Sequence, residues 1–125
     1  MAKKKILIVD DEEDFGQMVK INLEGTGKFE VRVEKKGSLA LESAKAFGPD
    51  LVLLDIMMRD LAGPAVASQL RSEPRFKDTP IIFLSAAAPK KETVTDEDQI
   101  AGHPYLSKPV DTDNLTRFLQ KYLPN

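Results

Sequence analysis

Runs of consecutive apolar residues, each followed at once by polar ones, dominate the pattern of this chain. Three such runs are residues 6–9, 51–54 and 81–84. They are typical of strands buried on both faces, because helices that cover both sides of a parallel sheet leave no reason for polar alternation. Residues 30–34 instead alternate polar and apolar side chains, which indicates an edge strand with one wetted face. A short outer strand is expected to begin at Pro104.

Between the strands, apolar residues recur at the three- and four-residue spacing of helices with one buried face. The first helix carries Phe15, Met18, Val19 and Leu23 on that face, and the last carries Leu115, Phe118, Leu119, Tyr122 and Leu123. We expect Ser38 to cap the second helix, Pro64 to open the third and Asp111 to cap the last. Residues 90–102 have few apolar positions, and the prediction there is a short helix starting near Thr95.

The order of these elements predicts the fold class. Strands that alternate with helices five times favour a parallel sheet with helices on both faces and right-handed crossovers. Because the alternating strand comes second, it belongs at an edge of the sheet. That placement favours a flavodoxin-like (βα)5 fold, a doubly wound α/β sheet with strand order 2-1-3-4-5. We expect residues 1–125 to form one domain.

Composition and charge exclude several kinds of site. A net charge of −2 argues against binding to nucleic acid or a membrane surface through bulk charge. The absence of cysteine excludes disulfides and cysteine zinc sites, and the single histidine, His103, which we expect in a surface loop, disfavours a histidine metal site. The apolar run at 6–9 is too short for a signal peptide, and no stretch reaches transmembrane length. We therefore expect a cytoplasmic protein without membrane association.

Polar residues follow four of the predicted strands at the end where each strand stops. They are Asp10 and Asp11, Asp55, Ser85 and Lys108. Because the carboxyl ends of parallel strands share one edge of a sheet, these side chains are expected to converge. Three adjacent carboxylates raise one another's pKa values unless a cation lies among them, and oxygen-only ligands select Mg²⁺. Together with the lysine and the serine, they predict a pocket for an oxyanion beside a carboxylate.

The same residues carry a resemblance to the receiver domains of two-component response regulators, over essentially the whole chain. The markers are Asp10-Asp11, Asp55, Gly63 eight residues beyond it, Ser85-Ala86, and the run from Tyr105 to Pro109. Each marker alone is weak, but their order and spacing together are highly specific. The chain is most similar in layout to single-domain receivers of the chemotaxis type.

The resemblance implies the chemistry at the acidic residues. Asp55 would be the phosphoacceptor, taking a phosphoryl group from a histidine on a sensor kinase or a histidine phosphotransfer protein. Asp11, Asp55 and the backbone carbonyl of Met57 would ligate Mg²⁺ directly, and Asp10 would act mainly through water. The protein would then be a regulator rather than a turnover enzyme.

The resemblance also implies a two-state switch. Ser85, Ala86 and Lys108 would bind the attached phosphoryl group, and Tyr105 would turn inward as Ser85 moves. The Lys108–Pro109 peptide would be cis. A downstream protein partner would read the change on the surface of the fourth helix, fifth strand and fifth helix. The receiver would be a monomer or a weak, phosphorylation-dependent dimer.

Two positions in the loop after the phosphoacceptor depart from the family pattern. Arg59 stands where the family usually has proline, and Ala62 stands where an acid is common. The departures bear on the shape of that loop and on partner contacts more than on chemistry.

Other functions fit parts of the pattern. A degenerate receiver would bind partners without phosphorylation, but the chemical positions are all intact. A Mg²⁺-dependent phosphatase with an aspartyl nucleophile would need an acid two residues after it, where Met57 stands. A flavodoxin-like cofactor binder would need a phosphate-binding loop where residues 10–14 are acidic. Because the chain ends directly after the last helix, we expect either a stand-alone receiver or one cut from a longer protein.

Overall fold

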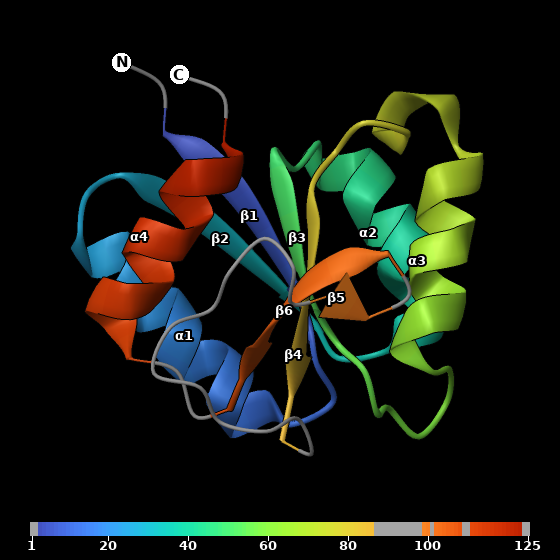
Figure 1. Ribbon diagram of the computed structural model, residues 1–125, viewed down its shortest axis with the longest axis horizontal. Helices are drawn as coiled ribbons and strands as arrows, with labels where there is room; N and C mark the ends of the chain where they lie inside the picture. Colours follow the sequence, from blue (N-terminus) through green and yellow to red (C-terminus); the bar gives the residue numbers. More distant parts are fainter. Residues whose placement is uncertain (1–2, 87–98, 101, 109–110, 124–125) are drawn as a thin grey trace.

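The computed structural model describes residues 3–86, 99–100, 102–108 and 111–123. The five parallel strands are β1 (Lys4–Val9), β2 (Phe29–Glu34), β3 (Leu51–Asp55), β4 (Ile81–Ser85) and β6 (His103–Ser107). The helices are α1 (Glu13–Gly25), α2 (Ala40–Phe47), α3 (Gly63–Ser72) and α4 (Thr112–Tyr122), with 3₁₀ turns η1 (Gly37–Leu39) and η2 (Pro74–Phe76). Helices α1 and α4 cover one face of the sheet, and α2 and α3 cover the other (Figure 1). Within the described residues, no helix has the length and apolar character needed to cross a bilayer.

The parallel strands lie in the order β2-β1-β3-β4-β6. This order confirms the predicted flavodoxin-like arrangement, with the alternating strand β2 at an edge. A sixth strand, β5 (Gln99–Ile100), pairs antiparallel with β6 at the other edge. The sequence did not reveal β5, because two residues carry no measurable periodicity. The helix predicted near Thr95 falls partly at residues 95–98, outside the described residues, whereas residues 99 and 100 form this strand.

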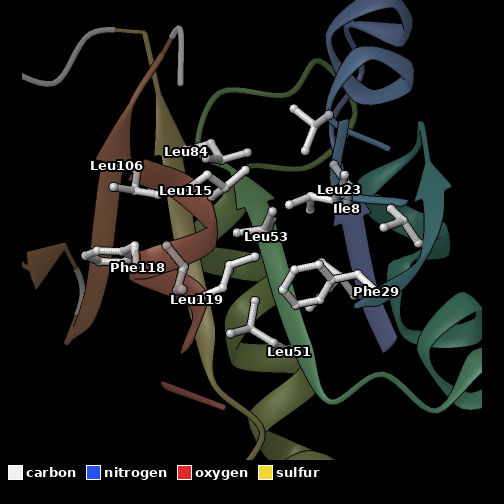
Figure 2. Close-up of a cluster of buried hydrophobic side chains, with 14 residues drawn as sticks. Ile8, Leu23, Phe29, Leu51, Leu53, Leu84, Leu106, Leu115, Phe118 and Leu119 are labelled. Carbon is white, nitrogen blue, oxygen red and sulfur yellow. The ribbon is translucent and has the colours of Figure 1, made fainter. Parts of the chain in front are cut away.

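Successive side chains of the buried strands point to opposite faces of the sheet and build two separate cores. The core under α1 and α4 includes Ile8, Leu23, Leu53, Leu84, Leu115 and Phe118 (Figure 2). The core under α2 and α3 includes Val9, Leu54, Val66, Leu70 and Phe83. Because both faces are covered by helices, every position in β3 and β4 and residues 6–9 of β1 are buried, which explains the unbroken apolar runs in the sequence.

Ser38 does not cap the second helix, contrary to the prediction. It lies within η1, and α2 begins at Ala40 without a side-chain cap. The backbone N–H groups of Gly37 and Ser38 instead donate to the carboxylate of Asp60, at 3.1 and 3.0 Å. These hydrogen bonds, led by the one from Ser38, hold the pKa of Asp60 below its ordinary value. The acceptor comes from the loop after β3, so local capping rules cannot find it.

Two further side chains lie elsewhere than predicted. Met18 is 42% exposed, although Val19 and Leu23 of the same predicted stripe are buried. The sheet covers a narrower face of α1 than the sequence pattern suggested. His103 is not in a surface loop, because it begins β6 and is half-buried, with its ring edge-on to Phe83 at 5.6 Å between centroids.

Candidate functional site

The carboxyl edge of the sheet collects the polar residues that the sequence singled out. Asp10 directly follows β1, Asp55 ends β3, Ser85 ends β4 and Lys108 directly follows β6. Asp10 and Asp55 are 0% and 4% exposed, and the serine and lysine are also buried. The parallel register places these strand ends side by side, so residues far apart in the sequence meet at one point.

Three acids converge at this edge. One carboxylate oxygen from each of Asp10, Asp11 and Asp55 lies within 4.8 Å of the other two. Opposite ligands of a Mg²⁺ ion are about 4 Å apart, so these oxygens fit around one ion if one of them acts through a water molecule. The donor set consists of oxygen atoms alone, which suits a hard divalent cation. The arrangement fits the predicted magnesium site.

The environment of Asp55 disfavours its negative charge. Burial, followed by the charge of Asp10 and then that of Asp11, raises the pKa of Asp55 from its ordinary 3.8 to about 6. The ammonium of Lys108 and a hydrogen bond from the backbone N–H of Met57 partly oppose the increase. At neutral pH the carboxylate is therefore mostly ionised, and a bound cation would stabilise it.

This raised pKa predicts a pH dependence. In the metal-free protein, the protonated form of Asp55 favours folding, because its pKa in the folded state lies above the ordinary 3.8. This contribution to the free energy of unfolding is complete below about pH 4 and is lost as the pH rises through about 6. Mg²⁺ affinity is expected to follow the opposite course and to fall below about pH 6, since a protonated carboxyl is a poor ligand.

Urea unfolding of the native chain and of Asp55→Asn, each measured from pH 4 to pH 8 without metal, tests the first part. The difference between the two curves is expected to change through this range, and a constant difference would contradict the raised pKa. Calorimetric Mg²⁺ titrations at pH 5 and pH 7 test the second part.

Lys108 brings a positive charge to the acids. Its Nζ lies 2.8 Å from Asp10 Oδ2 and 3.6 Å from Asp55 Oδ1. Burial by itself lowers the pKa of Lys108, but the close contact with Asp10 and the charges of the surrounding carboxylates raise it above its ordinary value overall. The ammonium is therefore charged at neutral pH and stands where an oxyanion on Asp55 would meet it.

The loop after β3 supplies backbone donors that the sequence analysis missed. The N–H of Arg59 donates to Asp11 Oδ2 at 3.0 Å, and the N–H of Met57 donates to the carboxylate of Asp55. A proline at position 59 has no N–H, so the departure from the family pattern gives Asp11 a donor. The Met57 side chain is 72% exposed, and the role of its carbonyl as a metal ligand stays a prediction.

The residues of the predicted switch lie at the end of β4 and within β6. Ser85 is buried, and its carbonyl accepts a hydrogen bond from the backbone N–H of Lys108 at 3.0 Å. Ala86 is exposed just beyond it. Tyr105 is 8% exposed and lies opposite Phe83 in the sheet, so its ring is buried in this structure. The predicted cis peptide involves Pro109, outside the described residues.

Two residues at the start of α1 also contact Lys108. Glu12 Oε1 lies 3.1 Å from its Nζ, and the ring centroid of Phe15 lies 4.5 Å from it. The sequence analysis counted Glu12 only among the acidic residues 10–14 and placed Phe15 on the buried face of the first helix. No local signal distinguishes these roles, because the contact is made with a strand end near the other terminus.

Comparisons with known proteins agree with this geometry. Residues 6–120 match the family described as the response regulator receiver domain. Among curated proteins, the chain is 36% identical over 115 residues to the uncharacterized transcriptional regulatory protein YkoG of Bacillus subtilis, covering 92% of this chain and 49% of that protein. It is also 36% identical to the nisin biosynthesis regulatory protein NisR of Lactococcus lactis, covering 89% of this chain and 46% of that protein. The chain thus spans about half the length of these relatives.

Solved structures show the same similarity. The chemotaxis protein CheY4 of Vibrio cholerae superposes with a TM-score of 0.84 at 29% identity, covering 98% of this chain and all of that chain. The receiver domain of the sensor histidine kinase PA1611 of Pseudomonas aeruginosa gives 0.81 at 28% identity, with 97% and 98% covered. That structure is described with a magnesium ion coordinated in its active-site cleft.

Proposed function

This chain belongs to the response regulator receiver domain family, and from that premise we propose that it is a phosphorylation-controlled signalling module with Asp55 as its phosphoacceptor. The observation that carries the proposal is the convergence of three acids and one buried lysine at the carboxyl edge of the sheet. Residues 6–120 match the receiver family, and we propose that residues 1–125 form one such receiver unit.

Asp55 is the nucleophile of the proposed reaction. An oxygen of its carboxylate forms a bond to phosphorus while the bond from phosphorus to a histidine nitrogen of the donor protein breaks. Attack requires the ionised carboxylate, and a pKa of about 6 leaves most of Asp55 ionised at neutral pH. The phosphodonor is a sensor histidine kinase or a histidine phosphotransfer protein.

Asp11 and Asp55 would hold Mg²⁺ directly, Asp10 would hold it through water, and the Met57 carbonyl would complete the protein ligands. The bound ion would neutralise charge on the phosphoryl oxygens during transfer. The carboxylate cluster supports this assignment, because the raised pKa of Asp55 and the oxygen-only donors favour a bound cation.

Lys108 and Ser85 bind the product in this proposal. The ammonium of Lys108, 3.6 Å from Asp55, pairs with a phosphoryl oxygen, and the Ser85 hydroxyl, with Ala86 beside it, contacts another. Movement of Ser85 and Tyr105 changes the surface of β6 and α4, which a downstream protein reads. The helix predicted to start near Thr95 is the other part of that surface, and its predicted start lies outside the described residues.

Intact-mass spectrometry after incubation with acetyl phosphate and Mg²⁺ tests the proposal. The native chain is expected to gain one phosphoryl group, and the gain is expected to disappear in Asp55→Asn and in the presence of a chelator. Asp11→Ala is expected to lose labelling because it loses a metal ligand. Labelling that persists in Asp55→Asn would contradict the assignment.

A native chain that shows no adduct is examined by a beryllofluoride titration followed by NMR. Saturable spectral changes that require Mg²⁺ indicate a competent site whose phosphoryl group hydrolyses quickly. No change identifies a degenerate receiver, the alternative function, and contradicts the proposal. Turnover of small phosphate esters would instead favour the phosphatase alternative.

A further inference from the structure

Glu12 occupies a donor of Lys108 that the proposed chemistry needs. Three carboxylates surround the ammonium, at 2.8 Å for Asp10, 3.1 Å for Glu12 and 3.6 Å for Asp55. Glu12 accepts a hydrogen bond from the ammonium, Asp10 forms a close ion pair with it, and Asp55 lies beyond hydrogen-bond distance. The ring of Phe15 lies 4.5 Å from the same nitrogen and covers another side of it.

A phosphoryl group on Asp55 would bring further negative charge to the same ammonium and would compete for it with Asp10 and Glu12. Asp10 is 0% exposed, and releasing it would leave a buried charge without a partner. The Glu12 side chain is 64% exposed, so water can solvate its carboxylate after release. Glu12 is thus the acid that leaves at the lowest cost.

We propose that Glu12 is a positioning residue that competes with the phosphoryl group for Lys108 and so weakens the phosphoryl-bound state. The inference rests on the proposed function, because it concerns how tightly the same pocket holds its ligand. In the absence of phosphoryl, Glu12 draws Lys108 toward the start of α1. On phosphorylation, the ammonium turns from Glu12 to the phosphoryl oxygens while its ion pair with Asp10 remains.

Glu13 offers a matched control for Glu12. It is the next residue, its side chain is 59% exposed, and it lies 3.5 Å from Lys35 rather than near Lys108. Glu12→Gln and Glu13→Gln therefore remove the same charge from neighbouring, similarly exposed positions. Only the first removes a partner of Lys108.

The experiment is a beryllofluoride titration in the presence of Mg²⁺, followed by NMR, on the native chain and the two variants. Glu12→Gln is expected to bind about threefold more tightly than Glu13→Gln at low salt, within the range for exposed ion pairs. The two affinities are expected to become nearly equal near 1 M salt, where the Debye length is about 3 Å. Equal affinities of the two variants at low salt would overturn the proposal.

A second readout needs no metal and no ligand. The ¹⁵N NMR signal of the Lys108 ammonium is expected to shift in Glu12→Gln and to stay unchanged in Glu13→Gln. An unchanged signal in both variants would show that the contact is absent and would overturn the proposal. If the native chain binds no beryllofluoride at all, the proposed function fails, and the competition fails with it. Binding by the native chain with equal affinities in the variants overturns the role of Glu12 alone.

Discussion

Lys108→Ala is expected to lower the free energy of unfolding of the metal-free protein at pH 8 by about 3 kcal/mol, in the range for breaking a buried ion pair. The substitution leaves the carboxylates of Asp10 and Asp55, which are 0% and 4% exposed, without their cation. Mg²⁺ is expected to restore part of the loss, because it supplies positive charge to the same acids. Urea unfolding with and without Mg²⁺ measures both effects.

The same variant tests the role of Lys108 in the switch. Mg²⁺ binding is expected to remain largely intact, while the spectral change that beryllofluoride causes is expected to weaken strongly. Lys45→Ala is the control, because Lys45 is 48% exposed and pairs with Glu73 at 3.6 Å on the surface. Its loss is expected to change the unfolding free energy by less than about 0.5 kcal/mol. If Lys108→Ala matched this control and switched normally, Lys108 would have neither role.

Gly63→Ala is expected to destabilise the fold by about 3 kcal/mol and to slow labelling of Asp55, because overpacking against backbone is costly. A Cβ at position 63 would lie 2.4 Å from the carbonyl oxygen of Asp55 and 2.8 Å from the Cα of Ile56. These are backbone atoms, so no side-chain rotation relieves the clash. The N–H of Gly63 also donates to the carbonyl of Ile56 at 2.8 Å, which ties the start of α3 to the phosphoacceptor.

Gly25→Ala is the control for this substitution. No heavy atom lies within 4 Å of a Cβ at position 25, which is the last residue of α1. Alanine there is expected to be neutral or to stabilise the helix by less than about 1 kcal/mol. Urea unfolding and the rate of labelling by acetyl phosphate compare the two variants. Equal stability and equal labelling would contradict the close approach of α3 to β3.

Much of the fold was predictable because the pattern of apolar and polar residues in each strand indicates how many of its faces are buried. The unbroken runs at 6–9, 51–54 and 81–84 indicated two covered faces, and the alternation in β2 indicated an edge. A parallel sheet then places all strand ends of one polarity together. The meeting of Asp10, Asp55 and Lys108 followed from that rule before any distance was known.

Contacts between loops were not predictable in this way. Asp60 accepts hydrogen bonds from the N–H groups of η1 although it lies 22 and 23 residues away. The capping rule that predicted Ser38 as the cap considers only nearby residues, so it could not identify Asp60. His103 was expected in a loop because β5 is too short to show in the sequence. Glu12 contacts a lysine 96 residues away, and nothing near it in the chain indicates that contact.

The sequence by itself determined the strand order, the two covered faces of the sheet and the residue types at its carboxyl edge. These properties depend on hydrophobic periodicity and on the shared direction of parallel strands, and both can be inferred from short stretches of the sequence. Only the tertiary structure decided which partner each charged group has. Lys108 lies between Asp10 and Glu12, and Asp11 accepts a hydrogen bond from the backbone N–H of Arg59. Electrostatic and hydrogen-bond energies depend on separations of a few tenths of an ångström, and those separations are set by packing between segments that are distant in the chain.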